Sequence, residues 1–287
     1  MLNLEDKITI KDANEEIYLP YWFLRTCCND NLNGEINLLK SVIKNCNNKN
    51  GNIFDIGAHG STFPSHSDTH NFHLFDPVFD KARLDHPHNL LKHDVNYDKD
   101  NVFIHKTCVN DTDFRLDTYC EKNNISKIDF LKIDTDGHDL GVINGLGDNI
   151  ECEYIQIEYD MNYFLQQLNI HEILSRFKDW HFFYILPDGM EEFKLNEFKH
   201  DFLYINIFIS KTYPTQILKD FELIINKDNI IEVNDLMEFT KSLWWEVTNT
   251  NINQLQHIKS QFLNKNTQFD ITTIRKQYYS LYINKLH

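Results

Sequence analysis

The chain has 287 residues, of which 41% are hydrophobic and 13% aromatic, enough for one large core or for one domain with an appendage. Its net charge of -15 at pH 7 predicts no binding to nucleic acid or to an anionic membrane, because those partners require a basic surface. No apolar run approaches the roughly 20 residues that cross a membrane, and the first residues lack the charged-then-apolar form of a signal peptide. The six cysteines form no CxxC pair, so we expect reduced thiols in a cytoplasmic protein.

The N-terminal part of the chain predicts an irregular lead-in followed by a helix. Residues 1–33 contain only short mixed runs of apolar and polar side chains. Apolar side chains then recur at helical spacing: Ile36, Leu39, Val42, Ile43 and Cys46. The asparagine-rich run at 45–52 ends this helix.

The first predicted strand, at 53–56, leads into a loop of small residues. The loop reads Gly57-Ala58-His59-Gly60-Ser61. A strand followed by such a loop is typical of sites for nucleotide-like ligands, because glycine lets the backbone come close to the ligand. The dinucleotide fingerprint would need glycine in place of Asp55, so we expect a ligand that offers a hydroxyl or ammonium group to a carboxylate. An ordinary tight turn is the alternative.

Strands and helices alternate from there to about residue 210. Further strands are predicted at 71–75, 102–106, 128–133, 154–158, 181–186 and 202–209. Helices are predicted at 78–84, 115–120 and 165–177, and directly after Gly137. The run Pro187-Asp188-Gly189 marks a turn between the last two strands. This alternation predicts a mostly parallel sheet with helices on both faces.

Polar and acidic residues follow the ends of these strands. They are Asp76-Pro77, Val109-Asn110-Asp111, Asp134 with Asp136, and Glu158-Tyr159-Asp160. Ligands of open α/β sheets bind beyond the carboxyl ends of the strands, so we expect the ligand at this edge. An acidic residue after the second strand, about 20 residues beyond the first loop, is where such folds hold the hydroxyl pair of a ribose.

The C-terminal part predicts helices only. Apolar side chains recur at helical spacing within 217–225, 236–247 and 274–282. We therefore divide the chain into a lead-in at 1–49, a central domain at 50–210 and a helical C-terminal extension at 211–287.

Three pieces of the sequence resemble the FkbM-type family of S-adenosylmethionine-dependent methyltransferases. Phe54-Asp-Ile-Gly-Ala-His59 is similar to the family's Asp-x-Gly-Ala-Asn cofactor loop, and Phe75-Asp76-Pro77 to its Glu-Pro step. The run 129–137 is similar to its Phe-Leu-Lys-Ile-Asp-x-Glu-Gly signature. The resemblance covers about residues 50–210 and implies a class I methyltransferase (Rossmann-like) fold with seven strands, six parallel and one antiparallel.

The sequence departs from the family pattern at four positions. The family usually has Asn at His59, Gly at Ser61, and Glu at Asp76 and Asp136. The two acidic changes keep the charge on a shorter side chain.

The resemblance implies S-adenosylmethionine as the cofactor. By this resemblance Asp76 holds the ribose hydroxyls, and Asp55 lies near the amino-acid part of the cofactor. The full set of cofactor-binding residues that we predict is Asp55, Gly57, Ala58, His59, Ser61, Asp76, Pro77, Asn110 and Asp134. The alternative is that Asp55 and Asp76 only cap the ends of strands.

Methyl transfer to an alcohol benefits from a general base that removes the proton of the acceptor. The candidates at the carboxyl edge are Asp134, His138, Asp136 and Glu158, with Asp134 as first choice and His138 as second. Lys132 is predicted with equal weight as a lysine that pairs with a local carboxylate and as a functional residue.

We predict no metal site. His66 and His70 have the i, i+4 spacing of a metal-binding helix, but the glutamate of the metalloprotease motif is absent and Pro64 disfavours the helix. A few of the seven histidines from His59 to His93 could instead line the acceptor pocket.

The resemblance further implies O-methyl transfer to a sugar hydroxyl, in a nucleotide sugar or in a surface glycan such as a capsule. One alternative is a magnesium-assisted sugar O-methyltransferase that uses Asp134, Asp160 and Asp136 as metal ligands. A second is a nicotinamide oxidoreductase, against which Asp55 argues. A third is a non-catalytic scaffold that binds a partner through its C-terminal helices, which could also join copies of the chain into a homo-oligomer.

Overall fold

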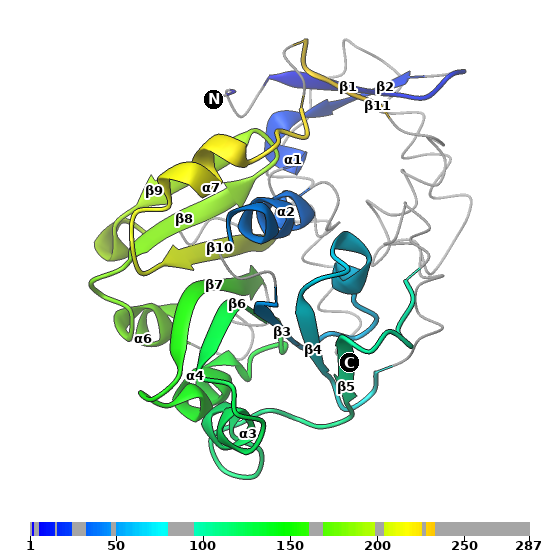
Figure 1. The fold of residues 1–287 in the computed structure, drawn as a ribbon. Helices are drawn as coiled ribbons and strands as arrows, with labels where there is room; N and C mark the ends of the chain where they lie inside the picture. Colours follow the sequence, from blue (N-terminus) through cyan, green and yellow to red (C-terminus); the bar gives the residue numbers. More distant parts are fainter. Residues whose placement is uncertain are drawn as a thin grey trace, which may run out of the picture.

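The computed structural model of the protein describes residues 2, 6–14, 16–24, 33–46, 50–79, 95–160, 169–198, 204–225 and 228–232. Its centre is a sheet of strand order β5-β4-β3-β6-β7-β10-β8-β9 (Figure 1). The strands are β3 (Asn52–Ile56), β4 (Asn71–Phe75), β5 (Val102–His105), β6 (Lys127–Ile133), β7 (Glu151–Asp160), β8 (His181–Leu186), β9 (Gly189–Phe193) and β10 (Tyr204–Ser210). The neighbours from β5 to β7 pair in parallel. Strand β10 is antiparallel to both β7 and β8, so β8 again runs in the direction of β7.

Among the described residues the sheet has eight strands, so the expected count of seven is wrong. The six parallel strands and the antiparallel β10 are present, and the additional strand is β9. It follows the predicted turn at 187–188 and folds back on β8, with Gly189 opposite Leu186. Because β9 lies at the edge of the sheet, Phe193 is its only buried residue. A strand with one buried side chain lacks the apolar pattern from which strands are predicted.

Helices cover both faces of the sheet, as the alternation predicted (Figure 1). On one face lie α2 (Glu35–Asn45) and α7 (Thr215–Asp220), with the 3-10 turn η1 (Phe63–His66). On the other face lie α3 (Leu116–Lys122), α4 (Asp139–Leu146) and α6 (Ile170–Ser175), with the 3-10 turn η3 (Leu195–Glu197) nearby. The helices predicted at 36–46, at 115–120 and after Gly137 are confirmed.

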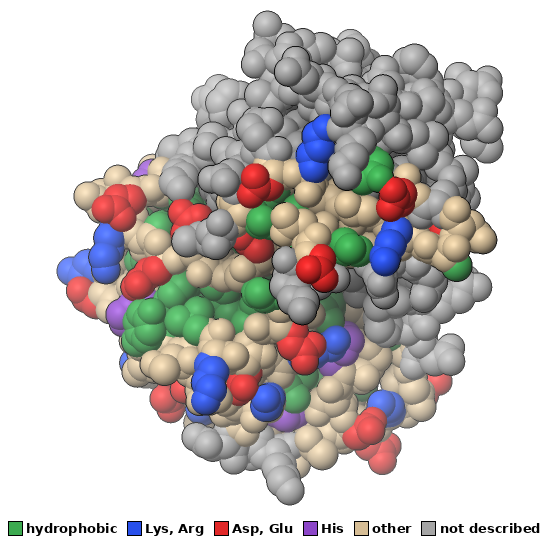
Figure 2. All heavy atoms as spheres, turned by 90° about the horizontal axis from the view of Figure 1, so that it is seen from above, with side chains coloured by type: hydrophobic (Ala, Val, Ile, Leu, Met, Phe, Trp, Pro, Cys, Tyr) green, Lys and Arg blue, Asp and Glu red, His purple; other side chains and the backbone are tan. Residues whose placement is uncertain are grey.

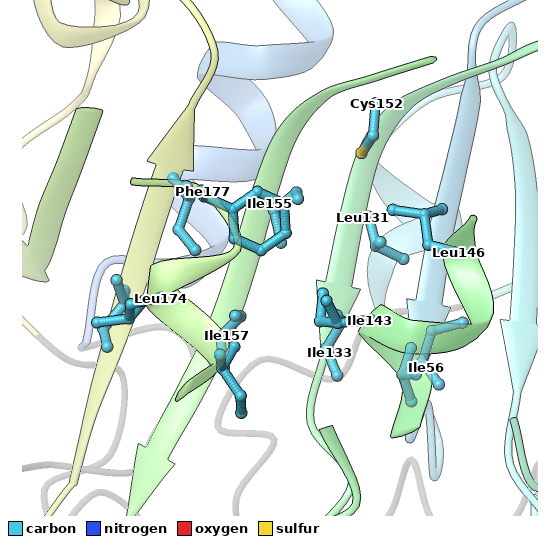
Figure 3. Packing of buried hydrophobic residues seen from close by; sticks show 14 of the residues in the cluster. Ile56, Leu131, Ile133, Ile143, Leu146, Cys152, Ile155, Ile157, Leu174 and Phe177 are labelled. Carbon is cyan, nitrogen blue, oxygen red and sulfur yellow. The ribbon is translucent and has the colours of Figure 1, made fainter. Parts of the chain in front are cut away.

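Each face of the sheet has its own core. Figure 3 shows one of them, in which α4 packs on β3 and β6 and the α6 region packs on β7. The labelled side chains are Ile56, Leu131, Ile133, Ile143, Leu146, Cys152, Ile155, Ile157, Leu174 and Phe177. In β6 every residue from Ile128 to Ile133 is buried, which confirms that this apolar run is a central strand covered on both faces.

A second, smaller sheet was not predicted. Its order is β11-β1-β2, formed by β1 (Lys7–Lys11), β2 (Glu16–Pro20) and β11 (Ile230–Glu232), and α1 (Tyr21–Leu24) follows β2. Ile8 and Ile10 are fully buried and alternate with polar residues, which is the pattern of a strand with one buried face. The Leu2 N–H donates to Asp188 Oδ2 (3.0 Å), and this contact attaches the N-terminal segment to the turn between β8 and β9.

Several expected helices lie wholly or partly outside the described residues. They are those at 78–84 beyond Phe79, at 165–177 before Asn169, at 236–247 and at 274–282. Within the C-terminal extension, α7 ends at Asp220, five residues before the helical pattern does, and the strand β11 follows. The three-part division of the chain stays a prediction.

The described surface carries charges of both signs. Figure 2 shows acidic and basic side chains interspersed around a strip of hydrophobic ones, so the described atoms of this view form no continuous basic stripe. In the part of the chain that the structure describes, no helix is long and apolar enough to cross a membrane.

Candidate active site

Backbone hydrogen bonds tie together the carboxyl ends of β3, β4 and β6. The Gly57 N–H donates to the Phe75 carbonyl at the end of β4 (2.8 Å). The Asp134 N–H donates to the Ile56 carbonyl at the end of β3 (2.9 Å). The loop after β3 therefore lies against both segments that the sequence marked with acidic residues, at the edge where ligands of such sheets bind.

Gly57 is required by the backbone of the neighbouring strand. Its φ of 83° lies in the left-handed region, and a Cβ at this position would be 1.6 Å from the Asp134 carbonyl oxygen. Gly57 therefore makes a close backbone approach to Asp134, and the approach to the cofactor predicted for it stays a prediction. The consequence is that the loop and the acidic turn after β6 lie in direct backbone contact.

The Asp76 carboxylate is held in a fixed orientation at the end of β4. Its Oδ2 accepts the His59 N–H (3.0 Å) and its Oδ1 accepts the Val78 N–H (2.7 Å), while the residue is only 5% exposed. His59 has a φ of 50°, a conformation in which both Asn and His are enriched. This shared preference explains how His can stand where the family has Asn.

Asp55 lies one residue before the end of β3 and is almost completely buried. Its register partner on β6 is Lys132, whose Nζ lies 3.9 Å from Asp55 Oδ1. Burial raises the pKa of Asp55, against which the ammonium of Lys132 and a hydrogen bond from Ser61 act. Within the described part of the chain, Asp55 Oδ1 has no hydrogen-bond partner. This buried oxygen is therefore able to accept a hydrogen bond from a ligand beside the loop where the cofactor is expected.

The turn after β6 presents the predicted bases. The side chain of Asp134 is 25% exposed, and Asp136 and His138 are exposed. Asp136 has a φ of 52°, and the turn is closed by Asp139, whose Oδ1 accepts the Thr135 N–H (3.1 Å). Three of the four predicted bases are therefore brought together within one turn. The fourth, Glu158, is half-buried on β7 in register with Asn206 of β10.

The remaining predicted cofactor residues fall into two groups. Ala58 is buried and its N–H donates to the Phe75 carbonyl (3.1 Å), and the exposed Pro77 follows Asp76, so both belong to this edge. Asn110 lies against α4, where its Cα would be 3.8 Å from a Cβ at Gly141 and its carbonyl oxygen 2.4 Å from one at Gly145. Its Oδ1 accepts the N–H groups of Thr112, Asp113 and Phe114, and so closes its own loop.

Two residues at this edge were missed or undervalued. Lys132 is 7% exposed, and its Nζ lies 3.0 Å from Asp134 Oδ2 and 3.1 Å from Glu35 Oε1. Glu35 begins α2 and is 1% exposed, although the sequence showed it only as the start of an amphipathic helix. A glutamate at the first turn of a helix is so common that its burial could not be predicted.

The histidine helix that Pro64 disfavours is indeed absent from this segment. The turn η1 ends at His66, and Ser67 is extended, so His66 and His70 do not share an α-helix. The Nδ1 atom of His70 instead lies 2.8 Å from Ser67 Oγ. Among the described residues no group of three or more His, Cys, Asp or Glu side chains is placed to hold a metal ion. The side chain of Asp160, a ligand in the magnesium alternative, lies outside those described.

The fold and this edge are typical of α/β enzymes, a class of protein whose members bind nucleotide-like ligands beyond the carboxyl ends of parallel strands. The chain matches the model of the methyltransferase FkbM domain over residues 35–184. It therefore belongs to the FkbM methyltransferase family and is an enzyme, which confirms the resemblance seen in the sequence. The oxidoreductase and scaffold alternatives do not agree with this membership. Members of such families typically use S-adenosylmethionine.

Two solved structures show weaker similarity. A precorrin-6y C5,15-methyltransferase from Geobacter metallireducens is 11% identical, and the similarity covers 62% of this chain and 88% of that one, with a TM-score of 0.34. A predicted O-methyltransferase from Agrobacterium tumefaciens is 13% identical, with 62% and 81% covered and a TM-score of 0.34. No curated protein sequence matches the chain.

Proposed function

We propose that this protein is an S-adenosylmethionine-dependent O-methyltransferase whose acceptor is a sugar hydroxyl, in a nucleotide sugar or in a surface glycan such as a capsule. The acceptor class comes from the family resemblance. The observation that carries the cofactor assignment is the Asp76 carboxylate, fixed by two backbone N–H groups at the end of β4. Each carboxylate oxygen has a further lone pair, so both can accept a ribose hydroxyl as well.

The neighbours of Asp76 suit the rest of the cofactor. Val78 is 62% exposed and offers an apolar surface to the adenine ring. Asp55, whose buried Oδ1 accepts no hydrogen bond from the described residues, suits the α-ammonium group of the amino-acid part. These residues fit the cofactor in both charge and hydrogen-bonding capacity.

The chemistry needs little from the protein beyond positioning and proton removal. When bound, S-adenosylmethionine supplies a methyl group on a positively charged sulfur. The acceptor oxygen forms a bond to this carbon as the carbon–sulfur bond breaks. Asp134, which reaches the surface beside the loop after β3, accepts the hydroxyl proton. His138, exposed in the same turn, is the second candidate for this role.

We also place the protein in the cytoplasm, where thiols stay reduced. Four cysteines among the described residues support this, because Cys46, Cys108, Cys120 and Cys152 are free thiols.

Calorimetric titration with S-adenosylhomocysteine, the demethylated cofactor, tests the cofactor assignment. We expect the wild type to bind it and Asp76→Asn to bind at least about tenfold more weakly, because a ribose hydroxyl loses a charged acceptor. Asp68→Asn is the matched control, since Asp68 is an exposed aspartate that pairs with Lys99 away from this edge.

Binding of equal strength by Asp76→Asn would contradict the assignment, and no binding by a folded wild type would remove the proposed function. A positive result justifies a screen of sugar acceptors. That screen is run with and without a chelator, because loss of activity with the chelator would favour the magnesium-assisted alternative.

A further inference from the structure

Lys132 lies at the centre of a buried cluster of carboxylates. Its Nζ is 3.0 Å from Asp134 Oδ2, 3.1 Å from Glu35 Oε1 and 3.9 Å from Asp55 Oδ1. The three carboxylates come from different places in the fold: the turn after β6, the first turn of α2, and β3. One ammonium group therefore links the helix layer to both acidic positions of the candidate site.

The three carboxylates of the cluster differ in their solvent exposure. The side chains of Glu35 and Asp55 are 1% and 2% exposed, whereas that of Asp134 is 25% exposed. The ammonium is thus held from the interior by Glu35 and extends toward the surface at Asp134. An ion pair that served stability alone would not require Asp134, its more exposed partner, to lie at the edge where the ligand binds.

Glu35 is itself held by a row of buried polar side chains. Its Oε2 accepts a hydrogen bond from Asn206 Nδ2 (3.4 Å), and Asn206 Oδ1 accepts one from Gln156 Nε2 (3.0 Å). At the start of α2 the Glu35 N–H donates to Asn33 Oδ1 (2.9 Å). Buried polar groups add little stability over apolar side chains, but a connected row of them fixes positions.

We propose that Lys132 is a positioning residue, anchored by Glu35, which sets Asp55 and Asp134 toward the amino-acid end of the bound cofactor. The inference rests on the proposed function, since it assumes that S-adenosylmethionine binds at this edge. By this inference helix α2 also belongs to the site, because it carries Glu35.

The physical reason lies in the cost of burying a charge. An isolated buried carboxylate takes up a proton rather than stay ionised. Burial raises the pKa of Asp55, and Lys132 is the strongest influence in the opposite direction. Without this ammonium, the pKa of Asp55 rises further, Asp134 loses its fixed partner, and the attraction for the α-ammonium of the cofactor weakens.

The test compares two ligands that differ only at the amino-acid end. S-adenosylhomocysteine carries the amino-acid part, and 5′-methylthioadenosine lacks it. In calorimetric titrations of the full chain, we expect Lys132→Met to bind S-adenosylhomocysteine about tenfold more weakly, as expected for a lost contact to a charged group. Binding of 5′-methylthioadenosine stays within about twofold. Glu35→Gln, which keeps the shape of the side chain, gives a smaller loss in the same direction.

Lys127→Met is the matched control. Lys127 lies on the same strand but at its amino end, where it pairs with Glu153 (2.7 Å) and Asp129 (3.3 Å). We expect it to leave both affinities unchanged. Circular dichroism establishes that each variant is folded, and Glu35→Gln carries the test if Lys132→Met does not fold.

The outcomes separate this inference from the proposed function. Wild type that binds neither ligand removes the proposed function. The positioning role is overturned if the wild type binds both ligands and Lys132→Met either loses affinity for both equally or keeps both affinities. A merely structural lysine does not distinguish the two ligands.

Discussion

At the residue scale, Gly57 gives the sharpest test of how the site is built. A Cβ at this position would lie 1.6 Å from the Asp134 carbonyl oxygen, and backbone atoms cannot give way as a flexible side chain can. Its φ of 83° adds a conformational penalty for any other residue. We expect Gly57→Ala to lower the free energy of unfolding by at least about 2 kcal/mol and to weaken cofactor binding.

Urea unfolding measures this change, with Gly141→Ala as the control. Gly141 lies in α4, where an added Cβ comes no closer than 3.8 Å to its nearest neighbour. Alanine is a better helix former than glycine, so this variant should gain about 0.5–1 kcal/mol. A Gly57→Ala protein as stable as wild type would show that the loop and the turn after β6 are not in contact.

Asp55 gives a second prediction at this scale, concerning pH. Because burial raises the pKa of Asp55, acidification neutralises it earlier than an ordinary aspartate. The α-ammonium of the cofactor then loses its partner. We expect the affinity for S-adenosylhomocysteine to fall as the pH is lowered from neutrality toward about 3.9, the ordinary pKa of aspartate, and the fall begins above that value. The affinity for 5′-methylthioadenosine changes little over the same range.

The comparison variant is Asp55→Asn, which has no charge to lose. Its affinity for S-adenosylhomocysteine should be low and independent of pH over the same range, as measured by calorimetry. Parallel pH dependence in Asp55→Asn and wild type would assign the effect to another group.

At the scale of elements, the sequence predicted those whose side chains follow a repeating apolar pattern. It missed the elements and contacts that have no such pattern. The central strands and α2 were predicted because long apolar runs and helical spacing are direct consequences of burial. The edge strand β9 was missed because only Phe193 is buried in it. The carboxyl edge could be located from acidic residues at strand ends, but the contact of Glu35 with Lys132 joins residues from α2 and β6, and no local pattern marks such a pair.

A chain of hydrogen bonds connects β4, β5 and α3. Tyr119 of α3 lies between two histidines, with its hydroxyl 2.9 Å from His73 Nδ1 and 2.9 Å from His105 Nε2. His73 Nε2 lies 3.3 Å from Asn52 Oδ1. Burial lowers the pKa of His73 to about 3 and also lowers that of His105. The folded protein therefore keeps both rings neutral.

This network predicts acid sensitivity. An unfolded histidine has a pKa near 6.5, so below that pH the unfolded chain binds protons that the folded chain does not. Stability is complete above about pH 6.5 and is lost as the pH falls toward the lower folded pKa values. For each histidine the loss approaches about 1.4 kcal/mol per pH unit. Urea unfolding at a series of pH values measures it.

His73→Gln should reduce this slope, whereas His181→Gln should not. His181 is partly exposed at the far edge of the sheet and takes no part in the network of His73, Tyr119 and His105. Equal slopes in wild type and His73→Gln would show that carboxylates alone account for the acid sensitivity.

At the scale of the whole molecule, the small sheet brings together segments from both ends of the described chain. In β1, Thr9 and Ile10 are in register with Ile230 and Ile231 of β11. The hydroxyl of Tyr21, in α1, donates to Asp188 in the turn between β8 and β9. Because the small sheet is bonded to the main one there, the two should unfold together rather than as separate domains.

Ile10→Ala tests this coupling. Ile10 is fully buried, so its truncation should cost about 2–5 kcal/mol. If the sheets are coupled, this loss appears in a single unfolding transition followed by near-ultraviolet circular dichroism, to which buried aromatic residues of the main sheet such as Tyr184 contribute. Thr9→Ala, at a half-buried position on the same strand, should shift that transition much less. In the opposite outcome, Ile10→Ala leaves the transition of the main sheet unchanged and only β1 loses amide protection. The small sheet would then be an independent unit that contributes nothing to holding the carboxyl edge in place.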